Sequence, residues 1–152
     1  MKKDLRKLIE EYLREVKLMQ LATVRDGQPW VCNVWFAADE DLNIYWFSST
    51  TRRHSSEVLE DNRVAAAFAL PHTPQDMPRG LQVEGVAEPL TKKADVEKAI
   101  SVYAGRIFPQ EQIDKFMKDK SKPHQFYRIH PTLFVLFDMV NFPDESRQEY
   151  RL

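Results

Sequence analysis

The residues of this chain that are best suited to chemistry lie between positions 48 and 56, in the run SSTTRRHSS. Six hydroxyl side chains there flank three consecutive basic residues, Arg52, Arg53 and His54. Hydroxyls donate single hydrogen bonds, arginine offers a bidentate charged fork, and a helix that begins nearby adds unpaired backbone amides. Together these groups suit a terminal phosphate. The simpler interpretation is that the hydroxyls only cap a helix whose basic flank faces solvent.

A second group of residues combines aromatic rings with an amide on two strands that we expect to be adjacent. Its members are Asn33, Trp35, Phe36 and Trp46. An aromatic wall beside an anion site suits a planar heteroaromatic ligand that carries a phosphate. Aromatic clusters are more often core packing, so both interpretations stay open on these residues alone.

Other reactive residue types are not spaced for catalysis. The four histidines are scattered, without helical ligand spacing to a carboxylate, which argues against a zinc or di-iron site. Cys32, the single cysteine, stands in the centre of an expected strand and is typical of a small buried residue. No serine elbow, catalytic dyad or carboxylate pair stands out. If the chain is an enzyme, we expect a cofactor to carry the reactivity.

Composition excludes several classes of protein. The four glycines are isolated, so no glycine-rich loop of the P-loop or Rossmann type can form. A formal net charge of −1 provides no general attraction for nucleic acid. No apolar run approaches the roughly 20 residues of a membrane helix, and one cysteine rules out a disulfide framework. We therefore expect a cytoplasmic protein with a single domain, residues 1–152.

The elements that must position these residues follow from hydrophobic periodicity and turn residues. We expect helices over 2–17, in the middle of 48–62, and over 92–109 and 110–120. We expect strands over 18–24, 29–39, 43–49, 63–70, 80–90 and 124–140, the last interrupted at Pro131. Asp26-Gly27 marks the first hairpin of an antiparallel meander.

The second expected strand is apolar on both faces. Trp30 and Cys32 alternate with Val31 and Trp35, so neither face is suited to water. A strand of this kind belongs in a barrel whose outer wall is covered by a helix, a ligand or a partner subunit. The alanines of the fourth strand, RVAAAFAL, leave room for close approach.

The order and spacing of three segments resemble those of the flavin-binding split-barrel superfamily of pyridoxamine 5′-phosphate oxidase. The segments are LATVRDGQPWVCNVWF, IYWFSSTTRRHSSEVLEDNRVAAAF and RGLQVEGVAEPL, which together cover about half of the chain. The resemblance implies an all-β core with flanking helices, built as a six-stranded antiparallel split β-barrel. It also implies a homodimer with FMN bound between the subunits.

The resemblance further implies a role for individual residues. Asn33, Val34, Trp35 and Phe36 would lie beside the isoalloxazine ring, and Gln82 would meet its pyrimidine edge. Ser48 and Ser49 would contact the ribityl and phosphate groups, and Arg53 matches the family's phosphate-binding arginine. His54 stands where the oxidase has lysine; a histidine can donate a hydrogen bond but need not be charged at pH 7, so Arg52 would compensate.

The C-terminus departs from the oxidase. The oxidase has an Arg-x-His and a tryptophan-containing tail there, whereas this chain has ESRQEYRL. We therefore do not expect oxidation of pyridoxamine phosphate, but an FMN-dependent oxidoreductase that acts on an unknown small molecule. The alternatives are a deazaflavin-dependent reductase, a haem-binding split-barrel protein with a histidine ligand, and a non-catalytic flavin-binding or sensor module.

Overall fold

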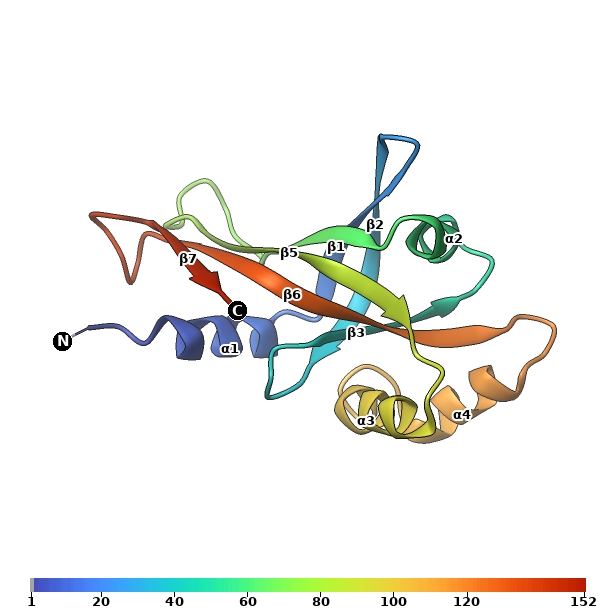
Figure 1. Ribbon diagram of the computed structural model, residues 1–152. Helices are drawn as coiled ribbons and strands as arrows, with labels where there is room; N and C mark the ends of the chain where they lie inside the picture. Colours follow the sequence, from blue (N-terminus) through green and yellow to red (C-terminus); the bar gives the residue numbers. More distant parts are fainter. Residues whose placement is uncertain (1) are drawn as a thin grey trace.

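A computed structural model describes residues 2–152 and has four helices and seven strands within that range (Figure 1). Met1, the first residue of the expected domain, lies outside the described residues. In chain order the elements are α1 Leu5–Glu15, β1 Leu18–Arg25, β2 Gln28–Ala38, β3 Ile44–Ser49, α2 Arg53–Glu60, β4 Arg63–Phe68, β5 Arg79–Pro89, α3 Lys93–Tyr103, α4 Gln110–Lys118, β6 His124–Asp138 and β7 Arg147–Arg151. The expected order is confirmed, and β7 is an addition to it.

The strands form one antiparallel sheet that closes on itself. Their order is β3-β2-β1-β4-β5-β6-β7. A further pairing of β3 with β6 closes the first six strands of the chain into a ring. Asp26 and Gly27 make the β1–β2 turn with φ values of 50° and 76°, the left-handed conformation of a tight hairpin. The fold is the split-barrel α+β fold that the family resemblance implies.

The ring is only partly closed between β2 and β3. These strands pair over three residues of each, 36–38 with 44–46, although β2 is 11 residues long. The far end of β3 continues along β6, where Ser49 lies opposite His124. Within the described residues, the edge of β2 from Gln28 to Trp35 therefore has no strand beside it. This opening is the split of the barrel.

Two apolar cores lie on opposite sides of the sheet. The larger fills the barrel and includes Phe36, Trp46 and Phe68, all 1% exposed or less. The smaller lies between the outer face of β3 and the helices α3 and α4, around Tyr45 and Tyr103. The sequence predicts that both faces of the second strand are covered, and this is confirmed at the C-terminal end of β2, where Phe36 lies in the larger core and Ala37 in the smaller.

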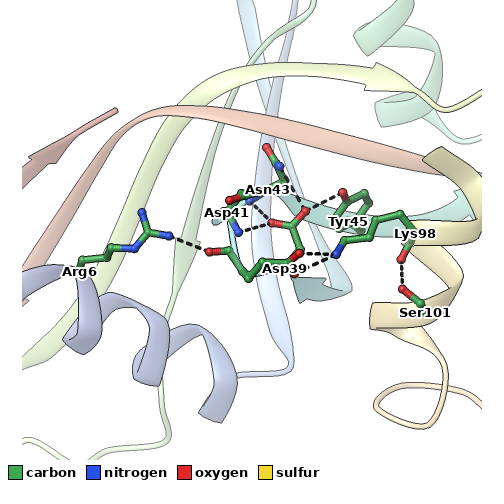
Figure 2. A network of polar contacts seen from close by, with 8 residues as sticks. Arg6, Asp39, Asp41, Asn43, Tyr45, Lys98 and Ser101 are labelled. Atoms are coloured by element: carbon green, nitrogen blue, oxygen red, sulfur yellow. Dashed lines mark hydrogen bonds and ion pairs between the residues drawn. The ribbon is translucent and has the colours of Figure 1, made fainter. Parts of the chain in front are cut away.

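The turn between β2 and β3 is fixed by the buried carboxylate of Asp39 (Figure 2). It accepts hydrogen bonds from the backbone of Asp41 and Asn43 and, at 2.8 Å, from the hydroxyl of Tyr45. Neighbouring Glu40 adds an ion pair of 2.7 Å with Lys98 on α3. The junction that leads into the split is therefore held rigidly by side chains.

The C-terminal third differs from the expectation in two ways. β6 runs unbroken through Pro131 for 15 residues, because a bulge opposite Glu84 and Gly85 absorbs the proline. β7 was missed because RQEYR is strongly polar, and only Gln148 and Tyr150 lie half-buried toward the sheet. No helix within residues 2–152 has the length and apolar character needed to cross a membrane.

Candidate functional site

A polar cleft of about 550 Å³ lies at the split, where the end of β3 turns into α2. It draws its walls from β2, β3, the first residues of α2 and the segment entering β6. The lining residues are Asn33, Val34, Phe47, Ser48, Ser49, Thr51, Arg52, His54, Lys122 and His124. Six of the ten residues named from the sequence thus meet in one place.

The turn at 49–55 is built from its own hydroxyls. Ser49 shares a hydrogen bond of 2.9 Å with Thr51, and Ser55 donates to the carbonyl of Ser49 at 2.8 Å. Arg52 is the N-cap of α2 but makes no capping bond with its side chain. The first amides of α2 are therefore not capped by Arg52, at the helix end where the dipole favours an anion.

Ser48 and His54 form a buried pair at the back of the cleft. Oγ of Ser48 lies 3.0 Å from Nε2 of His54, and the two residues are 8% and 7% exposed. Burial, and secondarily the charge of Arg52, lowers the pKa of His54, while Glu57 acts in the opposite direction. The lowered pKa favours the neutral form of His54, and the permanently charged residues of the lining are Arg52 and Lys122.

The two consecutive arginines have different surroundings. Arg52 lines the cleft, whereas Arg53 lies outside the lining. The guanidinium of Arg53 lies over the ring of Trp30, 4.1 Å from its centroid, and its Nε pairs with Glu57 at 3.0 Å. Glu57 is fully buried, so Arg53 compensates a carboxylate that has no access to solvent.

The expected aromatic wall is divided between two faces of β2. Phe36 and Trp46 lie opposite each other in the barrel core, and Trp46 stacks on Tyr127. Trp35 points outward, remains 51% exposed and meets Phe108 edge-on at 5.5 Å. Only Trp35 is therefore accessible to a ligand, and the other two rings are core.

The open edge of β2 offers backbone groups as well as side chains. The N–H of Phe36 donates to Lys17 on the β1 side. Because direction alternates along an antiparallel strand, the backbone groups of Asn33 and Trp35 point toward the split. Those groups are available to a ligand that lies along β2.

Gln82 lies apart from the cleft, on the outer face of the sheet. It belongs to a row of cross-strand partners that runs from Asn33 through Gln20 and Ala67. Gln20 donates to Asn33 at 2.8 Å, which links this row to the cleft. Gln82 and the alanines of β4 line a separate groove of about 460 Å³.

Three lining residues were not identified from the sequence, namely Phe47, Lys122 and His124, whereas Thr51 belongs to the hydroxyl run at 48–56. Lys122 and His124 enter only through the pairing of β3 with β6, which places Ser49 opposite His124. Nδ1 of His124 lies 2.7 Å from the carbonyl of Lys122 and donates to it, so Nε2 is the acceptor in the neutral form of the ring. The basic KSKPH segment was the available signal, but it stands about 70 residues from Ser49 in the chain.

The remaining sequence candidates stay outside the site. Burial raises the pKa of the Cys32 thiol to about 11, which suits a protonated packing residue. His130 pairs with Glu88 at 2.9 Å, and neither residue lines the cleft. Among residues 2–152, no group of three potential ligands is arranged to hold a metal ion.

A ring of antiparallel strands that opens beside a polar turn defines a split-barrel protein with a cleft suited to an anionic ligand. A comparison with protein families shows to which family of split-barrel proteins the chain belongs. The pyridoxamine 5′-phosphate oxidase family matches residues 5–135, and the chain is a member of it. No curated protein matches the chain.

Solved structures of low sequence identity share the fold. A heme-binding protein from Mycobacterium smegmatis is 14% identical with a TM-score of 0.79, over 99% of this chain and 59% of that one. A heme storage protein from Vibrio cholerae is 22% identical with a TM-score of 0.69, covering 85% and 91%. An FAD-binding protein from Mesorhizobium loti is also 22% identical, with a TM-score of 0.62 and coverage of 85% and 89%.

Proposed function

We propose that this protein binds FMN in the cleft at the split and uses it as a flavin-dependent oxidoreductase. The observation that carries the proposal is the composition of that cleft. Its polar end combines hydroxyls, Arg52, Lys122 and the start of α2, and its other end meets the open backbone edge of β2 beside Trp35. A phosphate suits the first end and a planar ring the second.

The chain's own groups would divide the binding between them. Arg52 and Lys122 would neutralise the phosphate, and the hydroxyls of Ser48, Ser49 and Thr51 would donate to it or to the ribityl chain. Backbone groups of Asn33 and Trp35 would bond the ring edge. When bound, FMN supplies hydride and single-electron chemistry, so the protein needs to bind, orient and shield rather than to provide a nucleophile.

A homodimer is part of this proposal. Leu18, Val31 and Trp35 lie on the outer face of β1 and β2 and are 40%, 58% and 51% exposed. A second copy placed on this face would cover these apolar side chains and close the open side of the split. The cleft would then lie between two subunits, as the family resemblance implies.

The test is the optical spectrum of the purified protein together with a titration by FMN. A yellow protein that releases FMN on denaturation, or a colourless one that binds added FMN stoichiometrically, supports the proposal. A protein that neither contains nor takes up FMN rejects it. Deazaflavin binding would appear as a distinct spectrum in the same experiment.

Haem binding is a second candidate, favoured by one specific observation. His124 lines the cleft with Nδ1 bonded to a carbonyl, so Nε2 presents a lone pair of the kind that ligates iron. Two of the structures that share the fold are those of a heme-binding protein and a heme storage protein. A Soret band that is lost in His124→Ala would favour haem, and its absence on haem addition would reject this candidate.

A further inference from the structure

The buried pair of Ser48 and His54 has no structural task that explains its position at the cleft. Ser55, one residue later, makes the bond that closes the turn. Ser48 and His54 bond each other, at 3.0 Å, and both line the cleft while 92% or more of each residue is buried. A hydroxyl and an imidazole thus meet at the wall where a phosphate would lie.

The charges around His54 are unbalanced in the free protein. From its own helix, Arg52 opposes protonation, and Glu57 favours it. From the segment entering β6, Lys122 and His124 line the same cleft, whereas β2 and β3 contribute only uncharged side chains there. Arg53 faces away, toward Trp30 and Glu57. An added anion would therefore favour the protonated form of His54, whereas Arg52 and Lys122 already carry their charge.

We propose that the Ser48–His54 pair selects ligands that end in a phosphate monoester, because His54 takes up a proton when such a ligand binds. The proposal rests on the proposed function, since it takes the phosphate of a flavin nucleotide as the ligand. His54 is a positioning residue here, acting on the ligand through Ser48.

The hydrogen-bond inventory of the pair explains the coupling. Neutral His54 can accept the hydroxyl proton of Ser48 at Nε2, which leaves Ser48 without a donor for the cleft. Imidazolium must donate from Nε2 to Oγ, and the hydroxyl hydrogen of Ser48 is then free to turn to the phosphate. The proton comes from solvent, so binding takes up one proton and breaks no covalent bond.

The same coupling distinguishes a monoester from other groups. A phosphate monoester is close to a dianion above its second pKa of about 6, whereas each phosphorus of a diphosphate diester carries one charge. The dianion stabilises the imidazolium more strongly over the same distance. FMN would drive proton uptake, FAD would drive less, and riboflavin would drive none.

Isothermal titration calorimetry at pH 7.5 in buffers of different ionisation enthalpy measures the protons taken up. We expect FMN to take up a fraction of a proton on the wild type and none on His54→Gln. FMN affinity falls about tenfold in His54→Gln, while riboflavin affinity stays unchanged. His54→Lys restores FMN affinity without proton uptake, because its charge is permanent. His130→Gln, a histidine control outside the cleft lining, retains the uptake.

Each other outcome has a definite meaning. Equal losses for FMN and riboflavin in His54→Gln, or proton uptake that persists in this variant, overturn the inference while leaving FMN binding intact. If the wild type does not bind flavin at all, the proposed function fails, and inorganic phosphate becomes the probe. A rise in the pKa of His54 on phosphate addition, followed by NMR of its ring protons, then supports the selectivity, and an unchanged pKa rejects it.

Discussion

Arg52 and Arg53 show how strongly the role of a side chain depends on the first turn of a helix. Arg52 is the N-cap, with extended backbone, whereas Arg53 is the first helical residue, so the two consecutive side chains leave the backbone in different directions. Arg52, as the N-cap, lines the cleft, and Arg53 pairs with the buried Glu57. The sequence predicted an anion site at this turn, and the resemblance favoured Arg53 as its anchor. Which arginine faces the cleft depended on where α2 begins.

Substitution of these arginines should therefore give opposite phenotypes. Arg52→Ala is expected to weaken FMN binding by about 1.5 to 3 kcal/mol, as for a charged hydrogen bond, with little loss of stability. Arg53→Ala is expected to destabilise the fold by about 1 to 3 kcal/mol, because Glu57 loses its partner, with FMN affinity kept. Fluorescence titration and urea unfolding measure the two effects. A larger loss of FMN affinity in Arg53→Ala than in Arg52→Ala would show that Arg53 binds the phosphate.

Cys32 gives a second prediction at the scale of one residue. Its thiol is half-buried, and burial raises its pKa to about 11. Since the thiolate is the nucleophile, alkylation by iodoacetamide at pH 8 should be far slower in the folded protein than in the urea-unfolded chain. The rate should rise only as the pH approaches the raised pKa. Equal rates in the two states would contradict the burial of this thiol.

Helices and strands were predictable where the local sequence pattern determines them, and less so where pairing with a distant strand determines them. The amphipathic α1, the Asp26-Gly27 hairpin and the alternation of β5 are local features, and the structure confirms them. The continuity of β6 through Pro131 depends on the bulge opposite β5, and β7 forms only because β6 offers it an edge. Lys122 and His124 could not be predicted as lining residues for the same reason, since the pairing of β3 with β6 brings them to the cleft.

Gly85 on β5 tests the bulge of β6 that lies opposite it. A Cβ at this position would collide with the backbone carbonyl of His130 on β6, and backbone cannot move aside cheaply. Gly85→Ala is expected to destabilise the protein by about 1 to 3 kcal/mol through overpacking. Gly80→Ala, on the same strand but with open space at its Cβ, is the matched control. Chemical denaturation compares them, and equal stabilities would show that the bulge relaxes.

At the scale of the whole molecule, a single chain leaves apolar side chains exposed on the outer face of β1 and β2. Phe36 and Ala37 show that α3 and the barrel core cover only the last part of β2. Beyond them, Val31 and Trp35 remain more than half exposed on a strand whose edge is also open. Open edges and exposed apolar faces are features that proteins normally cover. The groove lined by the β4 alanines continues this face and gives a second copy a concave place to dock.

Dimerisation through this face predicts a solution mass of twice the 17.9 kDa chain in light scattering. Val31→Glu places a charge at the centre of the face and should shift the protein toward monomer, because a buried unpaired carboxylate costs several kcal/mol. FMN affinity should fall with it, since the split loses its cover. Val140→Glu is the matched control: Val140 is also 58% exposed but lies in the β6–β7 connection, outside this face. A wild type of single-chain mass, or a Val140→Glu variant that dissociates like Val31→Glu, would place the contact elsewhere.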